Sequence, residues 1–169
     1  MKRTKLLALA LAGVMALALL TGCSDSRSKA KQVEECFRSL MKTRQNVDYQ
    51  KDETLDKKLE AIAQQFQPDW LDNRTGGLTE HARTIIINEL RGYLLTGSVW
   101  LWYGEVKPGQ SALAQAESMK YSQGIEIALL DSGIPTLQAI AFTMTGKKSD
   151  GHRYYLALRT NATIKTPQG

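Results

Sequence analysis

Few side chains in this 169-residue chain have the chemistry of a catalytic or metal site. The two histidines are His81, expected in the first turn of a helix, and His152, which follows a turn. Neither has a partner at the spacing of a metal-binding motif such as H-x-x-x-H or C-x-x-C. We therefore expect solvent-exposed histidines, no metal site, no cofactor and no catalytic residue.

The cysteines predict no disulfide. Cys36 falls on the apolar stripe of an amphipathic helix, which is typical of a small buried hydrophobic residue. A reactive thiol would need exposure and an activating cation or histidine. The other cysteine, Cys23, follows the apolar N-terminal run and is not expected to pair with Cys36.

Aromatic residues are the best candidates for binding a ligand or a partner: Trp70, Trp100, Trp102 and Tyr103. Trp100 and Trp102 alternate with Leu101 on a predicted strand, so the two tryptophans share one face. That face is either core or pocket lining, or an exposed patch for a partner. Because both faces of this strand are apolar, we expect one tryptophan to be structural and the other to be partly exposed.

The predicted elements that position these residues are helices in the first part of the chain and strands in the second. Apolar residues recur at three- and four-residue steps in three segments, which predicts helices over 31–46, 54–67 and 79–97. The character then becomes extended, and residues 111–117 form either a short helical turn or a long loop. Strands are predicted over 99–103, 119–130, 136–145 and 154–164.

Short, glycine-containing connections at 131–133 and 147–151 predict hairpins between consecutive strands. The expected architecture is α+β: three N-terminal helices packed on one face of a four-stranded antiparallel meander. This order and length resemble the NTF2-like, or cystatin-like, fold, in which N-terminal helices pack in the concave side of a curved sheet. No residue motif carries that resemblance, so it implies a fold and a possible pocket but no functional residue.

The first 23 residues have the three parts of an export signal. Lys2, Arg3 and Lys5 precede the uncharged run 6–20, which is shorter than the ~20 residues that a spanning helix needs. Leu20-Thr21-Gly22-Cys23 resembles the lipobox of bacterial lipoproteins. The resemblance implies cleavage before Cys23 and lipidation of its thiol. The expected organisation is a signal peptide at 1–22, a lipidated tether at 23–30 and one α+β domain at 31–169.

The net charge of the chain argues against a nucleic-acid partner. Cleavage would remove three positive residues and lower the formal net charge from +5 to near +2. The remaining basic residues are interleaved with acids, so no nucleic-acid partner is expected. The sequence favours a non-enzymatic binding or assembly module, anchored in the cell membrane or outer membrane through acylated Cys23, with an envelope protein or small ligand as partner. The alternatives are a small-molecule binder or enzyme using an NTF2-like pocket, and an immunity or inhibitor lipoprotein.

Overall fold

The computed structural model describes residues 28–70, 77–122, 124–128 and 137–164. The predicted signal peptide, Cys23, most of the tether and the connection at 131–133 lie outside these residues. The helices are α2 (Lys29–Gln45), α3 (Glu53–Gln65), a 3₁₀ turn η1 (Pro68–Trp70), α4 (Glu80–Leu90) and α5 (Ala112–Glu117). The strands are β1 (Leu94–Glu105), β2 (Lys120–Tyr121), β3 (Ile125–Ala128), β4 (Leu137–Met144) and β5 (Tyr154–Ile164).

The first two helices follow the predicted apolar spacing, and the short helical turn predicted as one alternative at 111–117 is α5. On α2, Val33, Cys36, Phe37 and Met41 are buried, as their three- and four-residue steps require. Helix α3 begins where the Asp52 side chain accepts a hydrogen bond from the backbone N–H of Leu55, at 2.7 Å.

The third helix begins as predicted and ends earlier. The Thr79 hydroxyl accepts from the backbone N–H of Ala82, at 3.3 Å. The helix ends at Leu90, so the predicted end at Gly97 is wrong. Leu94–Gly97 instead begins β1, because it pairs with the last residues of β5. Gly97 is not a helix cap: it lies at an irregularity in β1 with φ +126°, a conformation that glycine adopts readily.

The predicted four-strand meander is wrong in strand order. The sheet is antiparallel and open, with the order β2-β1-β5-β4 and with β3 also paired to β1. The last strand therefore lies between the first strand and β4, and β4 does not neighbour β3. The hairpin between β4 and β5 is confirmed. Pairing β1 with β5 over eleven positions joins the longest strands at the centre of the sheet.

The predicted strand 119–130 is divided into β2 and β3, which both pair with β1. Between them, the buried Ser122 replaces regular pairing: its backbone N–H donates to Leu101 O at 2.8 Å, and its hydroxyl accepts from Leu101 N–H at 3.1 Å. A serine that uses its side chain in place of a backbone partner ends the regular ladder.

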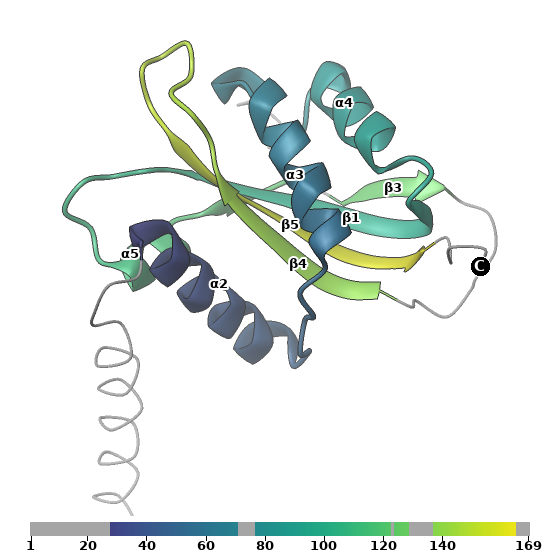
Figure 1. The fold of residues 1–169 in the computed structure, drawn as a ribbon, viewed down its shortest axis with the longest axis horizontal. Coiled ribbons are helices and arrows are strands. Elements are labelled where there is room, and N and C mark those ends of the chain that lie inside the picture. Colours follow the sequence, from purple (N-terminus) through teal and green to yellow (C-terminus); the bar gives the residue numbers. More distant parts are fainter. Residues whose placement is uncertain (1–27, 71–76, 123, 129–136, 165–169) are drawn as a thin grey trace, which may run out of the picture.

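Helices cover both faces of the sheet, so the expectation that all three N-terminal helices share one face is wrong. Figure 1 shows α3 and α4 on one side and α2 and α5 on the other. Two separate apolar clusters result. The α3-side cluster includes Leu59, Ile86, Leu101 and Leu156. The α2-side cluster includes Phe37, Trp102, Ile140 and Tyr155. Alternate residues of each central strand therefore enter opposite cores.

The chain passes from one face to the other around the edge of β4. The linker between α2 and α3 forms an isolated parallel bridge with that strand: Gln50 N–H donates to Gln138 O at 2.9 Å, and Ile140 N–H donates to Gln50 O at 3.2 Å. The Arg38 guanidinium donates to Ile140 O. These contacts satisfy backbone groups that an edge strand would otherwise expose to another chain.

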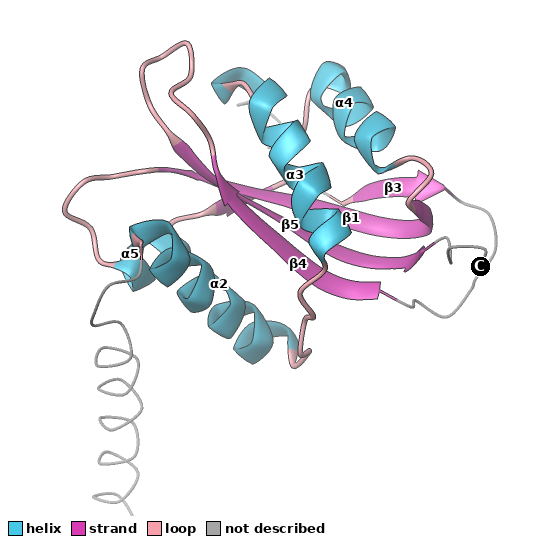
Figure 2. Ribbon diagram, in the orientation of Figure 1, coloured by secondary structure: helices cyan, strands magenta, loops and turns pink. Residues whose placement is uncertain are grey.

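At one end of the sheet, the β4–β5 loop and the segment after β1 both extend beyond the strands, in different directions (Figure 2). The Lys148 ammonium fastens the loop to the C-terminal end of α3 by donating to Ala63 O at 2.7 Å and Gln64 O at 3.0 Å. A cation is favoured there by the helix dipole.

Candidate functional site

The sequence-predicted aromatic candidates are not brought together in one site. Trp70 is 2% exposed in the α3-side cluster, where its ring packs edge-on against Phe66 with centroids 5.3 Å apart. Trp102 is 8% exposed in the α2-side cluster, packed edge-on against Phe37 at 5.4 Å. The sheet separates these two tryptophans, so they cannot line a common pocket.

Trp100 and Trp102 differ in exposure, as predicted. Trp100 is half-buried at the margin of the α2-side cluster, whereas Trp102 is in its interior. Tyr103 is half-buried against the α3-side cluster, with its ring 5.9 Å from that of Phe66. Of the four candidates, Trp100 is therefore the one that can contribute to a site on the α2 side of the sheet.

A guanidinium covers the Trp100 ring. Arg159 on β5 is the register partner of Trp100 on β1, and its Cζ lies 3.9 Å from the ring centroid. This is the geometry of a cation–π contact. The backbone of Gly124 packs against the pyrrole part of the indole, because a Cβ at Gly124 would lie 3.0 Å from Trp100 Nε1. Trp100 is thus a support that holds Arg159 in place.

A cavity of about 220 Å³ opens beside this pair, beyond the C-terminal end of α2. Three strands, β1, β5 and β4, supply its floor, and the end of α2 with the following linker supplies its wall. Its lining residues are Gln45, Val47, Tyr49, Trp100, Gln138, Arg159 and Asn161. Among these described residues Arg159 alone is charged, and three others are amides. The lining thus offers one fixed cation and several groups that both donate and accept hydrogen bonds.

No carboxylate of the described residues forms an ion pair with Arg159. Its Nε is buried without a hydrogen-bond acceptor among those same residues. Burying an unpaired donor of a charged group costs free energy, of order 1–3 kcal/mol or more. Among the described strand residues, the acidic one closest to Arg159 in register is Glu126, whose carboxylate accepts instead from the Ser98 hydroxyl at 2.6 Å. The arginine is therefore positioned by packing and is available to an anionic group from outside.

The sequence patterns did not single out Arg159 as a candidate site residue. A signal was present: Arg159 directly follows the apolar run Tyr154 to Leu158 on a central strand. The other polar lining residues come from three separate segments and have no shared sequence pattern: Gln45, Tyr49, Gln138 and Asn161.

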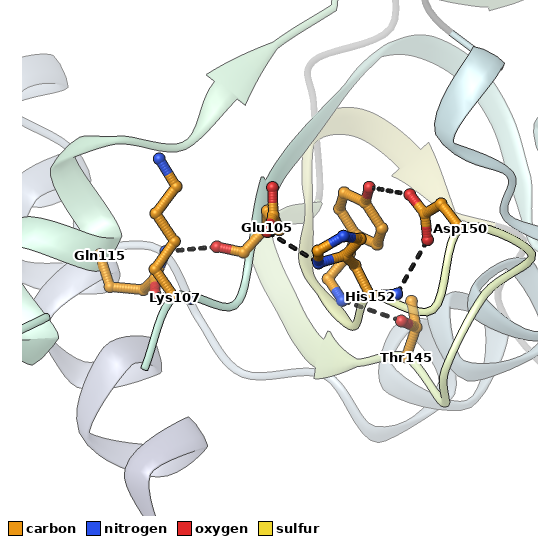
Figure 3. Close-up of polar contacts among 7 residues, drawn as sticks. Glu105, Lys107, Gln115, Thr145, Asp150 and His152 are labelled. Atoms are coloured by element: carbon orange, nitrogen blue, oxygen red, sulfur yellow. Dashed lines mark hydrogen bonds and ion pairs between the residues drawn. The ribbon is translucent and has the colours of Figure 1, made fainter. Parts of the chain in front are cut away.

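A second polar cluster lies at the opposite end of the sheet, where β1 ends and the β4–β5 loop returns (Figure 3). His152 Nδ1 lies 2.9 Å from Glu105 Oε1, and both side chains are partly exposed. A carboxylate beside one imidazole nitrogen favours the tautomer in which the other nitrogen is basic. The expected exposure of His152 is confirmed, and its acidic partner was not foreseen.

Asp150 organises the loop next to this pair. Its carboxylate accepts from the Tyr154 hydroxyl at 2.6 Å and from the backbone N–H of His152 at 2.9 Å. These two hydrogen bonds hold the pKa of Asp150 below its usual value. Burial, together with the neighbouring Asp150 carboxylate, raises the pKa of Tyr154. The Thr145 hydroxyl accepts from Tyr154 N–H at 3.0 Å, so the cluster braces the hairpin.

Gln115 on α5 connects the same end of β1 to the α2 side. Its Nε2 donates to Glu105 O at 2.7 Å, and its Oε1 accepts from Lys107 N–H at 2.9 Å (Figure 3). A cavity of about 200 Å³ nearby is lined by Tyr103, Gly104, Glu105, Lys107, Ser118, Lys120 and Tyr154. Glu105 is one of its lining residues and His152 is not, so the imidazole lies beside this cavity and not in its lining.

The remaining candidates occupy the positions expected of structural residues. Cys36 is 7% exposed on α2, and His81 is exposed on α4. Across the described ranges, no three or more His, Cys, Asp and Glu side chains gather as a metal-ion site. Within those ranges, no helix has the length and apolar character needed to cross a bilayer.

Comparison of the chain with protein-family models, with curated proteins and with solved structures finds no match.

Proposed function

We propose that the chain is an extracytoplasmic lipoprotein, anchored in the cell membrane or outer membrane through acylated Cys23, whose domain is a non-enzymatic binding module. Its binding site is the cavity beside Trp100 and Arg159. One observation supports the binding role. The Cζ atom of Arg159 lies 3.9 Å from the centroid of the Trp100 ring, and the guanidinium has no carboxylate partner among the described residues. Its partners are the lipid bilayer and a small ligand or envelope protein.

The proposed lipid anchor and extracytoplasmic location are supported by the sequence of residues 1–23. A positive start, an apolar run of signal-peptide length and Leu20-Thr21-Gly22-Cys23 agree with lipid modification of the cysteine. Each buried CH₂ contributes ~0.8 kcal/mol, so two or three acyl chains hold a protein far more firmly than one. Lys29 begins α2 only six residues after Cys23, so the tether would keep the domain close to the bilayer.

The composition of the cavity supports binding over catalysis. General acid–base and nucleophilic chemistry needs a titratable pair, or a nucleophile beside a base. The described lining residues offer a guanidinium, three amides and the Tyr49 hydroxyl. An arginine remains protonated throughout the physiological range and transfers no proton. These groups can recognise a ligand, and they supply no base.

An enzyme or small-molecule binder with an NTF2-like pocket is the second candidate. The Glu105–His152 pair at 2.9 Å favours it, since this arrangement can supply a general base. The nearby cavity, lined by Tyr103, Lys107 and Lys120, would then take the substrate. The immunity or inhibitor alternative draws support from the short edge strand β2, where Tyr121 is 63% exposed.

Two experiments test the two halves of the proposal. Metabolic labelling with a clickable fatty acid should label the wild type and leave Cys23→Ala unlabelled. Equal labelling of the two proteins would show that Cys23 does not carry the lipid. For the site, thermal shift of the full-length protein with peptides, sugars and phosphates should find a ligand whose effect disappears in Arg159→Gln. If no ligand distinguishes Arg159→Gln from the wild type, the cavity is not the binding site.

A further inference from the structure

We infer that the cavity beside Arg159 binds a short peptide through its free C-terminal carboxylate. This inference rests on the proposed binding function and identifies the ligand class of that same site.

The charge of the cavity fits one anionic group of low charge. Arg159 is the single charged residue among the described lining residues, and a guanidinium pairs with a carboxylate through two parallel hydrogen bonds. The C-terminal end of α2 is the negative end of its dipole, and Gln45 at that end lines the cavity. Glu126 lies near the floor through its hydrogen bond to Ser98. These negative groups disfavour a doubly charged phosphate.

The neutral groups of the cavity fit peptide bonds. Gln45, Gln138 and Asn161 each present an amide that both donates and accepts, which matches a backbone N–H and C=O. A sugar ring would instead need an aromatic face on which to stack. Of the two aromatic residues in the described lining, Trp100 is already covered by Arg159, which leaves Tyr49. A peptide end therefore uses more of this surface than a sugar acid does.

The size of the cavity fits a chain end. Its volume of about 220 Å³ lies below the ~300–1,000 Å³ of pockets that enclose drug-sized ligands. Only the last residues of a peptide would be enclosed, and the rest would lie outside. Exposed Gln138 and Asn161 flank the cavity where such a chain would leave.

Calorimetric titration of full-length protein in detergent tests the inference. The probes are tri-alanine, tri-alanine amide, D-glucuronate and inorganic phosphate. Removing one charged hydrogen-bonding partner weakens such contacts about tenfold or more, so tri-alanine should bind at least that much more tightly than its amide. Arg159→Gln should lose this preference. Arg153→Gln, the same substitution at the exposed position just before β5, should bind as the wild type does.

Asn161→Asp provides a second variant that leaves the arginine in place. Asn161 is exposed, so the fold should tolerate the change. The new carboxylate would compete for Arg159 and weaken tri-alanine binding about tenfold. Equal affinity for tri-alanine and its amide, or unaltered binding by Arg159→Gln, would overturn the inference.

Stronger binding of glucuronate or phosphate, if lost in Arg159→Gln, would overturn the peptide assignment and leave the proposed binding function standing. If none of the four probes binds saturably, the peptide inference is wrong. The proposed function then depends on the wider thermal-shift panel, which tests it separately.

Discussion

Arg159 and Trp100 are direct cross-strand partners, and the guanidinium carbon of one lies 3.9 Å from the ring centroid of the other. The contact immobilises a long, flexible side chain before any ligand arrives. Less conformational entropy is then lost when the arginine binds an anion, because preorganisation reduces the cost of association. Trp100 supports Arg159 at the margin of the α2-side cluster, whereas Trp102, two positions later on β1, is in its interior. The two tryptophans should therefore respond differently to mutation.

Trp102→Ala should lower the free energy of unfolding by ~3–5 kcal/mol, the usual cost of removing a large buried aromatic side chain. Trp100→Ala should lower it by about 1 kcal/mol, since this ring is half-buried. Urea melts at constant pH measure both. Equal losses in the two variants would show that both rings are core residues and that Trp100 does not border a site.

Gly97→Ala should destabilise the protein by at least ~2 kcal/mol, because left-handed backbone strain alone costs ~1–3 kcal/mol. The new Cβ would also lie 2.4 Å from Asn161 O and 2.5 Å from Ala162 Cα, both on the backbone of β5. Gly146→Ala is the matched control, since its Cβ would meet nothing within 4 Å. Thermal and urea denaturation should separate the two variants, and similar stabilities would place Gly97 in a different backbone conformation.

Asp150→Asn should be less stable than the wild type near neutral pH. The hydrogen bonds from Tyr154 and from the His152 backbone hold the pKa of Asp150 below its usual value. The folded pKa is therefore depressed, so the ionised carboxylate stabilises the fold above the unfolded pKa of about 3.9. That contribution is lost as pH falls through the folded pKa.

The stability gap between wild type and Asp150→Asn should consequently narrow below about pH 4. Urea melts across the acid range measure it, and Tyr154→Phe, which removes the hydroxyl donor, should raise the pKa of Asp150 in an NMR titration. A gap that stays constant with pH would mean that the substitution acts through packing.

Cys36 should react slowly with a thiol reagent in the native protein and rapidly in urea. Its side chain is 7% exposed in the α2-side cluster, so the reagent reaches it mainly through local or global opening. Absorbance of the released thiolate follows the reaction. Fast labelling of Cys36 in the native, fully folded protein would contradict the packing of α2 on the sheet.

Local patterns were sufficient for most elements. The spacing of Val33, Cys36 and Phe37 predicted a buried helix face, and Thr79 predicted a helix start, because both depend on neighbours within one or two turns. The α+β class followed from helices that precede strands. The end of α4 was missed because Leu94–Gly97 has helix-compatible residues and becomes a strand only through its long-range pairing with β5.

The site depended on a relationship that no local pattern encodes. The sequence by itself determined that Trp100 and Trp102 share a strand face and that both faces of that strand are apolar. The tertiary structure decided that β5 lies beside β1, which places Arg159 on Trp100. It also decided that α2 and α3 lie on opposite faces, which places Trp70 across the sheet from Trp102. Alternation specifies which side chains share a face, whereas strand order and face covering are set by contacts between residues far apart in the chain.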